Sequence, residues 1–547
     1  MIVEIRQLES MDCWNVVLLT DLPFQSFVID NKWVFKLKHR DNVVDKRKSR
    51  LVVLGYQQEK GQDFLERFSP TCSQITLRLI LGLTAIIGWR SIDMDALSAF
   101  ISSKLAVGEH VYMKMPNGFN TLQDTHCLSL NRCIYGLCQS PRAFFMLTRE
   151  VYINAGFTQL KSDKCVFVKI ENNIIGGPAS LSPEDVINHG AFVSMSNVPP
   201  AQRIYSSCPH SVAALFIIVY VDNNALRYNC DELVEQFEAS IAADARIQLH
   251  RDGNLEWFLS VRYAFDMTTG AIGCNQEAYI DRLLRKYGLD QCNATKLPMN
   301  PGTDLALLPL PAKPNKLCVL AYSALIGELL FIAINTAPQI SYAVSCLTRY
   351  MVVSTPAHLE VAKQVLRYLR GVKGDMIRWC ARDVSSTHTV GQVYGYADAS
   401  FADDSTNRKS TLAYFLFVNN AVFSWRSCLG SIVATSTTEA ELQAFAMCAA
   451  EVLYARKLCM ELGFTQLHAT TIYEDNTGCI SLAQHMHLRN RSKHIALRFC
   501  FVSALIESGQ LTPVQCASAD NIADLGTAAR ARPAFERMKA IMFGDRL

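Results

Sequence analysis

The sequence of 547 residues lacks the features that mark several special classes of protein. No apolar run approaches the roughly 18 residues that a membrane-spanning helix needs, so we expect no membrane partner. The N-terminal residues do not have the composition of a signal peptide, and no two of the 19 cysteines are spaced as Cys-x-x-Cys. We therefore expect reduced thiols and a cytoplasmic or nuclear location, without secretion.

Net charge is nearly absent as well. The formal charge of +3 is too small to indicate a nucleic-acid partner, so such a partner has to be inferred from local clusters. Half of the residues are hydrophobic and 19% are charged, which is a globular composition. A chain of this length exceeds a single hydrophobic core, and about two to four domains are expected.

One apolar stretch ends abruptly at an acid. Residues 215–221 are aliphatic or aromatic, and they are followed by Asp222, Asn223 and Asn224. This pattern predicts a buried strand that ends in a tight hairpin and presents one carboxylate at its tip. An ordinary buried strand with an Asp in its turn would have the same pattern.

In the C-terminal third, several acids stand at the ends of predicted elements. Asp398 and Asp475 each end a strand-like run. The residues Ser436-Thr437-Thr438-Glu439 form a capping-box pattern that opens a long helix, with Glu441 in its first turn. Asp524 opens or flanks a terminal helix. Each of these acids, taken alone, is more often a cap or turn residue than a catalyst.

Basic residues gather on a predicted hairpin near the N-terminus. Residues 32–40 and 43–56 lie on either side of Asp41-Asn42, which is a turn signal. Lys48 and Arg50 belong to the returning strand. A charge run of this kind is commonly a solvated face, and the functional alternative is a surface that holds phosphates.

Longer strings resemble the reverse transcriptase and ribonuclease H region of Pol polyproteins from copia-type LTR retrotransposons. The most specific is Cys133-Ile134-Tyr135-Gly136-Leu137-Cys138-Gln139-Ser140-Pro141-Arg142-Ala143-Phe144, which is similar to Leu-Tyr-Gly-Leu-Lys-Gln-(Ala/Ser)-Pro-Arg-Ala-Trp in that family. Others are Lys48 through Tyr56, Phe68-Ser69-Pro70, Val111 through Phe119, Tyr220-Val221-Asp222-Asn223 and Arg491-Ser492-Lys493-His494-Ile495. The resemblance covers nearly everything from Lys32 to about Phe543.

The resemblance implies a polymerase site. Asp95 and Asp222 would be its catalytic, metal-binding carboxylates, and Asn223 stands where the family has a second Asp. Two Mg²⁺ ions per active site, with Mn²⁺ as an alternative, are the implied cofactors. The residues expected at the nucleotide or template are Lys48, Arg50, Gln139, Arg142 and Tyr220.

A ribonuclease H site is implied too. Its catalytic, metal-binding residues would be Asp398, Glu441, Asp475 and Asp524, because a two-metal site needs clustered hard carboxylates. His494 would assist proton transfer or product release, and a structural helix-cap role explains it equally well. Departures from the family, such as Gly430 for a usual Gln, remove none of these carboxylates.

The implied fold class is α/β (α+β), a right-hand polymerase followed by a ribonuclease H-like α/β domain. Residues 1–30 are left uninterpreted. We expect the fingers and palm at 31–270, a helical thumb and connection at 271–385, and the ribonuclease H-like domain at 390–547. Residues 171–211 lack periodicity, so we expect a poorly ordered insert, either a lineage-specific loop or a translated intron.

The implied activity is RNA-directed DNA polymerisation with ribonuclease H activity. The implied partners are an RNA or DNA template-primer, deoxynucleoside triphosphates and an RNA–DNA hybrid, in cytoplasmic particles or the nucleus. Asn223 removes one charge, and unit charges about 4 Å apart interact by roughly 4 kcal/mol at an effective dielectric near 20. That is about three orders of magnitude in rate if it acts on the transition state. The alternative is a catalytically degenerate remnant with at most nucleic-acid binding or residual ribonuclease H activity.

Overall fold

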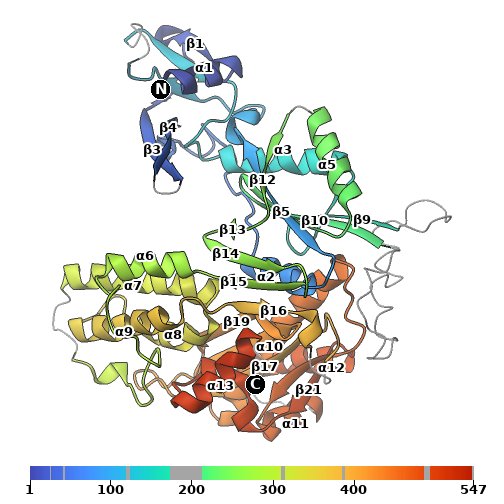
Figure 1. Cartoon of the computed structure of the whole chain (residues 1–547). Helices are drawn as coiled ribbons and strands as arrows, with labels where there is room; N and C mark the ends of the chain where they lie inside the picture. The colour runs from blue at the N-terminus through green and yellow to red at the C-terminus, as the bar shows by residue number, and fades with distance from the viewer. Residues whose placement is uncertain are drawn as a thin grey trace. The chain divides into compact units, whose positions relative to one another are not determined.

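The computed structural model describes residues 1–24, 26–40, 43–118, 124–172, 212–244, 246–309, 315–384, 388–485 and 493–544. The predicted insert at 171–211 lies outside these residues, apart from Glu171 and Asn172. The described chain forms two compact units (Figure 1). The first contains Met1–Cys72, Ser91–Ile170 and Ala213–Asn254, and the second contains Ser73–Arg90 and Leu255–Leu547.

The first unit is built around a six-stranded sheet with the order β12-β5-β11-β10-β9-β8. Its strands and covering helices are β5 (Arg90–Leu97), α3 (Ser140–Asn154), β8 (Thr158–Gln159), β9 (Val166–Asn172), β10 (Val212–Tyr220), β11 (Asn223–Tyr228), α5 (Asp231–Asp244) and β12 (Gln248–Gly253). Strands β10 and β11 form the hairpin that the apolar run predicts.

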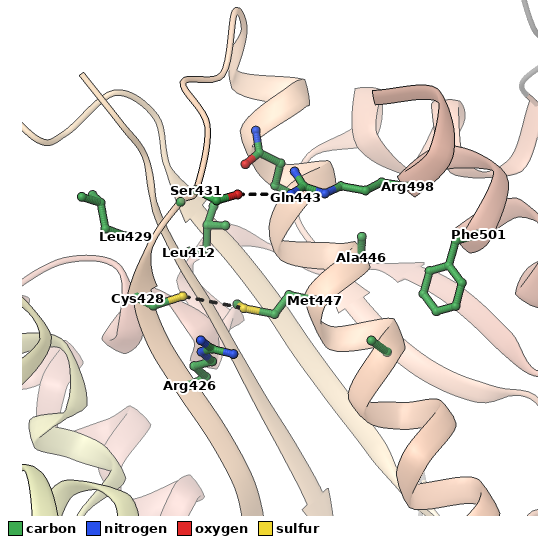
Figure 2. A pocket seen from close by; sticks show the side chains of 12 residues that line it. Leu412, Arg426, Cys428, Leu429, Ser431, Gln443, Ala446, Met447, Arg498 and Phe501 are labelled. Carbon is green, nitrogen blue, oxygen red and sulfur yellow. Dashed lines mark hydrogen bonds between the residues drawn. The ribbon is translucent and has the colours of Figure 1, made fainter. Parts of the chain in front are cut away.

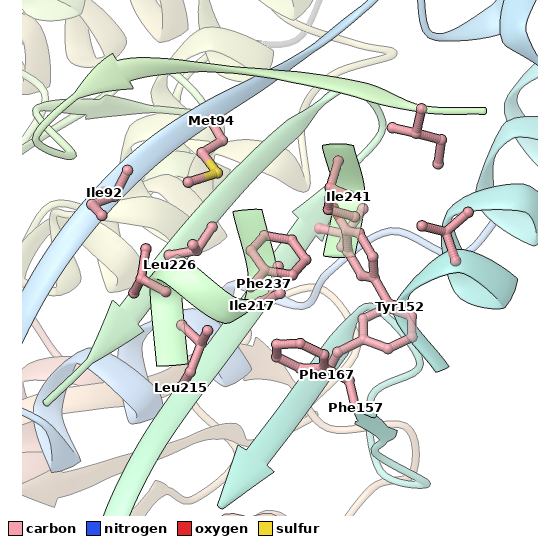
Figure 3. Packing of buried hydrophobic residues seen from close by; sticks show 14 of the residues in the cluster. Ile92, Met94, Tyr152, Phe157, Phe167, Leu215, Ile217, Leu226, Phe237 and Ile241 are labelled. Atoms are coloured by element: carbon pink, nitrogen blue, oxygen red, sulfur yellow. The ribbon is translucent and has the colours of Figure 1, made fainter. Parts of the chain in front are cut away.

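The core of this unit lies on one face of the sheet. Leu215 and Ile217 of β10 and Leu226 of β11 pack with Phe237 of α5 and Tyr152 of α3 (Figure 3). Successive side chains of a strand point to opposite faces, so alternate residues of β10 enter this cluster. Their burial holds the hairpin in place, because each large apolar side chain that is fully buried contributes roughly 1.5–3 kcal/mol.

A second sheet of the first unit has the order β1-β7-β6-β2, and the basic hairpin β3-β4 pairs separately. The elements are α1 (Ile2–Ser10), β1 (Trp14–Leu18), β2 (Val28–Ile29), β3 (Asn31–Arg40), β4 (Val43–Val53), β6 (Tyr112–Lys114) and β7 (His126–Leu130). Residues 1–30, which the sequence left uninterpreted, thus supply α1, a short 3-10 helix at Leu19–Asp21, and strands β1 and β2.

The end of β4 lies against the turn at Gly136. The Val53 N–H donates to the Tyr135 carbonyl at 2.8 Å. Gly136 has a φ of +98°, and a Cβ at this position would overlap the carbonyl oxygen of Val53. Only glycine fits here, and this close approach sets Tyr135 beside the strand that carries Arg50.

The second unit begins with a helix from the N-terminal third of the chain. Helix α2 (Gln74–Leu83) packs on β19 (Ala421–Leu429), far along the sequence. The buried guanidinium of Arg78 donates to the carbonyls of Phe423, Ile334 and Asn335 at 2.6, 2.8 and 2.9 Å. Residues 73–90, expected among the fingers and palm, therefore pack within the C-terminal unit.

The middle of this unit combines a sheet of order β13-β14-β15-β16 with a group of helices. The elements are β13 (Trp257–Phe258), β14 (Val261–Asp266), β15 (Ala271–Asn275), α6 (Glu277–Lys286), α7 (Lys316–Asn335), α8 (Ser341–Thr348), α9 (Pro356–Val372) and β16 (Ile377–Trp379).

Helix α7 is 20 residues long and apolar enough to cross a bilayer, and 33% of that stretch is buried. The prediction of no such run is wrong, because one acid, Glu328, does not disqualify a span. A core helix has the same length and composition, so α7 is weak evidence for a membrane.

The C-terminal part contains a five-stranded sheet of order β19-β18-β17-β20-β21. Its elements are β17 (Tyr394–Ser400), β18 (Thr411–Val418), β19, α10 (Thr437–Glu461), β20 (Thr470–Glu474), α11 (Thr477–His485), α12 (Lys493–Glu507), β21 (Leu511–Gln515) and α13 (Arg532–Phe543). The predicted cap of α10 is half right. The Ser436 hydroxyl accepts from the Glu439 N–H at 3.1 Å, but the Glu439 carboxylate accepts from the Thr435 N–H at 2.7 Å.

Candidate active sites

The first candidate site lies at the tip of the β10–β11 hairpin. Tyr220 pairs with Asn223, which leaves Asp222 in the two-residue turn between them. The Ala96 N–H of β5 donates to the Asp222 carbonyl at 2.8 Å. Because Asp95 precedes Ala96, this hydrogen bond brings the hairpin tip beside the strand segment that carries Asp95.

The side chains of the two asparagines after the turn both donate hydrogen bonds to Asp222. The amide Nδ2 of Asn223 donates to Oδ1 of Asp222 at 3.3 Å. Asn224 donates to the carbonyls of Asp222 and Met94 at 3.2 and 3.4 Å, and its Oδ1 accepts from the Tyr152 hydroxyl at 2.8 Å. Asn223 therefore occupies one carboxylate oxygen of Asp222 with a hydrogen bond, and its own side chain carries no charge.

Tyr135 lies near this site, although the sequence analysis gave it no functional role. The guanidinium carbon of Arg50 lies 4.3 Å from the centre of its ring. Burial raises the pKa of Tyr135, Arg50 lowers it, and the carboxylates of Asp222 and Asp95 raise it further. The ring thus contacts the basic hairpin and interacts electrostatically with the acids of the first site. Its place inside the most specific string of the sequence was the available signal.

Two other residues expected at the nucleotide are engaged elsewhere. Gln139 is buried, its Nε2 donates to the Asp63 carbonyl at 3.1 Å, and its Oε1 accepts from Gln58 at 3.1 Å. Arg142 forms an ion pair with Glu66 at 2.5 Å. The amide of Gln139 is thus used within the fold, and its contact with a nucleotide stays a prediction that this geometry does not support. Two more residues expected at the nucleotide or template, Lys48 on β4 and Tyr220 on β10, are half-buried.

Asp93 lies two residues before Asp95 on the same strand. Its pKa is raised to about 6 by burial and by the carboxylates of Asp252 and Asp95. Within the described residues, however, no group of three metal-ligand side chains forms at this hairpin. The first site thus places the strand segment of Asp95 beside the hairpin tip of Asp222, and no close group of three carboxylates forms there among the described residues.

The second candidate site lies at one edge of the five-stranded sheet. Asp398 lies near the end of β17, Asp475 directly follows β20, and Glu441 lies in the first turns of α10. Strands β17 and β20 are parallel neighbours, so their carboxyl ends meet at the same edge. One carboxylate oxygen of each of the three residues lies within 4.8 Å of the other two.

Burial sets the electrostatics of this cluster. It raises the pKa of Glu441 to about 10, and the carboxylates of Glu474, Asp398 and Asp475 add to the shift. Burial also raises the pKa of Asp398 to about 7, with Asp524 adding to it and the Thr527 hydroxyl opposing it. When ionised, these buried carboxylates repel one another because little water screens their charges. A bound cation would relieve this repulsion.

The donor set fits a divalent metal ion. It consists of carboxylate oxygens, the hard ligands that Mg²⁺ prefers. Oε2 of Glu441 is buried and has no hydrogen-bond partner among the described residues. A buried carboxylate oxygen without a donor is costly unless a cation satisfies it. Asp398, Glu441 and Asp475 are therefore the residues that could hold such an ion.

Glu474 is a further member of the cluster that the sequence analysis missed. Its side chain is fully buried, and its pKa is raised to about 9 by burial and by the Asp475 and Asp398 carboxylates. Its Oε1 accepts from the Asn476 N–H at 3.1 Å, whereas its Oε2 is unpaired within the described ranges. No sequence signal distinguished it, because a Glu at a strand end is commonly solvated.

Asp524 lies beside the cluster, on the short helix η9 (Ile522–Gly526). Asn521 anchors this helix by donating to the Ala397 carbonyl of β17 at 3.0 Å. Burial raises the pKa of Asp524 to about 6, and the Arg530 guanidinium, at 2.7 Å, opposes the rise. His494 lies in the first turn of α12, and its side chain falls outside the described residues.

Comparison with known proteins shows which protein family part of the chain resembles. Residues 12–187 match the family model described as reverse transcriptase (RNA-dependent DNA polymerase). These residues include Asp95 and Tyr135 of the first candidate site. Residues 12–187 are therefore similar to reverse transcriptases, and the predicted mixed α/β fold is confirmed by the helices and strands of the structure.

Some relatives match nearly the whole chain. The retrovirus-related Pol polyprotein from transposon TNT 1-94 of Nicotiana tabacum is 27% identical over 98% of this chain and 37% of the relative. That from transposon RE1 of Arabidopsis thaliana is 28% identical over 94% of this chain and 31% of the relative. The chain is therefore similar to Pol polyproteins of plant transposons, and it spans about a third of the length of these relatives.

A solved structure is similar across the same range. The foamy viral protease-reverse transcriptase, in complex with double-stranded DNA, aligns with a TM-score of 0.47 and 10% identity. The alignment covers 94% of this chain and 69% of that chain.

Proposed function

We propose that this chain is the RNA-directed DNA polymerase and ribonuclease H portion of a copia-type Pol polyprotein, with an impaired polymerase centre and a complete hybrid-cleaving centre. The observation that carries the proposal is the contrast between the two clusters. Three carboxylates approach within 4.8 Å at the second site, whereas Asn223 stands beside Asp222 at the first. Two-metal phosphoryl transfer needs the full set of acids.

At the second site, Asp398, Glu441 and Asp475 would hold two Mg²⁺ ions, or Mn²⁺. When bound, these ions lower the pKa of a water and stabilise the leaving oxygen of the RNA strand. Asp398 also accepts a hydrogen bond from the Thr527 hydroxyl, which orients one of its oxygens. Asp524, joined to Arg530, adds negative charge at the rim of the cluster. His494 is proposed to assist proton transfer or product release.

At the first site, Asp95 and Asp222 would hold metal ions for nucleotide addition. Arg50 stacks on Tyr135, which interacts electrostatically with these acids, and this supports a place for the triphosphate near them. Lys48, Tyr220, Arg142 and Gln139 remain proposed contacts to nucleotide or template. The substrates are a primed RNA or DNA template and deoxynucleoside triphosphates, and the RNA strand of an RNA–DNA hybrid for the second site. The proposed location is a cytoplasmic particle or the nucleus.

A second candidate function follows from Asn223. A degenerate retrotransposon remnant would bind nucleic acid at most, or keep only residual hybrid cleavage. This second function is supported by the amide of Asn223, which donates a hydrogen bond to the Asp222 carboxylate that would bind a metal ion.

The test is a pair of assays on the purified full chain in Mg²⁺ or Mn²⁺. We expect cleavage of a labelled RNA–DNA hybrid together with slow primer extension. Fast template-dependent synthesis would contradict the impairment, and loss of both activities would establish the remnant instead.

A further inference from the structure

A cavity of about 480 Å³ lies in the C-terminal part of the second unit, and Asp398, Glu441 and Asp475 are not among the residues that line it. It is bounded by the edge strand β19 and by helices α10 and α12 (Figure 2). Volumes of this order are typical of sites for small ligands. The residues that matter for its chemistry are Arg426, Ser431, Gln443, Met447, Arg498 and Phe501.

Gln443 is the unusual residue of this cavity. It is only 5% exposed, yet both its Nε2 and its Oε1 lack hydrogen-bond partners among the described residues. An unsatisfied buried amide costs roughly 1–3 kcal/mol, so such groups normally find a partner. Gly430 faces this amide, because a Cβ built there would lie 3.5 Å from Oε1. The family resemblance has a Gln at position 430, and in this chain no side chain from that position reaches the amide of Gln443.

The rest of the lining supplies a cation and an apolar wall. Arg498 donates to the Ser431 hydroxyl at 3.3 Å, and no carboxylate pairs with it in the part of the chain that the structure describes. Arg426 is a poorer anion site, because the carboxylate of Glu451 on α10 interacts with it. Figure 2 shows Met447 and Phe501 lining the cavity from the helices.

We propose that this cavity binds a single nucleotide, with its base edge on the amide of Gln443 and its phosphate on the guanidinium of Arg498. A glutamine amide presents one donor and one acceptor side by side, which is the pattern that pairs with a nucleobase edge. Arginine is the preferred cation for phosphate, and an aromatic ring such as that of Phe501 gives a base a surface to stack on. The ligand is either a free nucleotide or the terminal nucleotide of a strand.

The site does not depend on catalysis at either acidic cluster. The experiment measures binding of AMP, GMP, CMP, UMP and inorganic phosphate to the full chain by calorimetry, in EDTA. At least one nucleotide should bind more tightly than inorganic phosphate. Failure of hybrid cleavage would leave this result unchanged, so the two proposals fail separately.

Variants separate the two contacts. Gln443→Met, which conserves the volume, should weaken the nucleotide about tenfold and leave inorganic phosphate unchanged, since one hydrogen-bonded group contributes about 1.4 kcal/mol. Arg498→Gln should weaken both ligands. Arg532→Gln, on an exposed arginine paired with Glu536 at 2.8 Å, is the matched control and should bind as the wild type. Thermal unfolding of each variant verifies that it is folded.

Two results would overturn the proposal. One is that no nucleotide binds better than inorganic phosphate, which would mean that water satisfies Gln443. The other is wild-type affinity in Gln443→Met. If the site is present, competition between the bound mononucleotide and a 5′-phosphorylated oligonucleotide assigns the source: displacement identifies a strand terminus, and no displacement identifies a free nucleotide.

Discussion

The amide Nδ2 of Asn223 lies 3.3 Å from Oδ1 of Asp222 and donates a hydrogen bond to it. The substitution of an amide for an acid at this position therefore has two effects. It removes one negative charge, and it occupies an oxygen of the acid that remains. Both effects would weaken the binding of the metal ions that we propose at the hairpin.

Asn223→Asp should raise the rate of primer extension by up to about three orders of magnitude, because it restores the charge and frees Asp222. The measurement is single-turnover nucleotide addition on a primed template. Asn223→Ala separates the two effects, since it frees Asp222 without adding charge, and it should recover little activity. Equal rates in the wild type and Asn223→Asp would exclude this residue as the cause of the impairment.

Asp475→Asn should abolish cleavage of a labelled RNA–DNA hybrid and leave primer extension unchanged. The reason is that Asp475 supplies one of the three oxygens that approach within 4.8 Å. Asp520→Asn, which changes a carboxylate that is 64% exposed, is the control and should cleave normally. Undiminished cleavage by Asp475→Asn would remove that residue from the site.

The metal-free chain should lose stability as the pH rises. Folding raises the pKa of Glu441 to about 10, of Glu474 to about 9 and of Asp398 to about 7, from ordinary values of 4.5, 4.5 and 3.8. The folded state then holds more protons than the unfolded state between those values, so the free energy of unfolding falls with rising pH through that window.

Melting temperatures in EDTA from about pH 5 to about pH 9 test this sign. Mg²⁺ should restore more stability at the upper end, because the carboxylates must lose their protons to bind it, and calorimetry should detect the released protons. A melting temperature in EDTA that climbs steadily over the same range would contradict the burial of these acids.

Gly136→Ala should destabilise the first unit by more than about 3 kcal/mol, or prevent its folding, since a positive φ costs roughly 1–3 kcal/mol and an overlap with the backbone adds to it. The matched control is Gly61→Ala. Gly61 has a φ of +91° with open space around it, so only the cost of the backbone conformation applies. Denaturant unfolding should rank the variants in this order, and equal losses would show that the contact with Val53 is unimportant.

Gln443→Met should stabilise the chain by about 1–3 kcal/mol in the absence of ligand, because it removes a buried amide that has no partner among the described residues. Gln466→Met is the opposite case. Gln466 accepts from the Val393 N–H and donates to the Gly391 carbonyl, both at 2.9 Å, so its replacement should destabilise. A loss of stability in Gln443→Met would mean that its amide is satisfied.

Local patterns were enough to predict several parts of both sites. The apolar run before Asp222 predicted the β10–β11 hairpin, and strand-like runs ending in acids predicted the positions of Asp398 and Asp475. These features depend on side-chain alternation and on turn residues, which act between neighbours in sequence. The N-terminal cap of α10 at Ser436 was predicted for the same reason.

Residues whose roles depend on distant neighbours were not predictable in this way. Gln139 belongs to the most specific string, yet contacts with Gln58 and Asp63 use its amide. Glu474 has the sequence context of a solvated residue, and its burial arises only when helices cover β20. Helix α2 packs within the C-terminal unit because Arg78 bonds to carbonyls some 250 to 350 residues away.

By itself, the sequence determined the resemblance to copia-type Pol polyproteins, the strands and turns that carry the acids, and the presence of Asn223 where that resemblance has an acid. Only the tertiary structure decided which carboxylates approach one another, which of them are dehydrated, and where an amide such as that of Gln443 is left without a partner. The physical reason is that pKa shifts and unsatisfied hydrogen bonds are set by burial, and burial is produced by the packing of segments that are far apart in the chain.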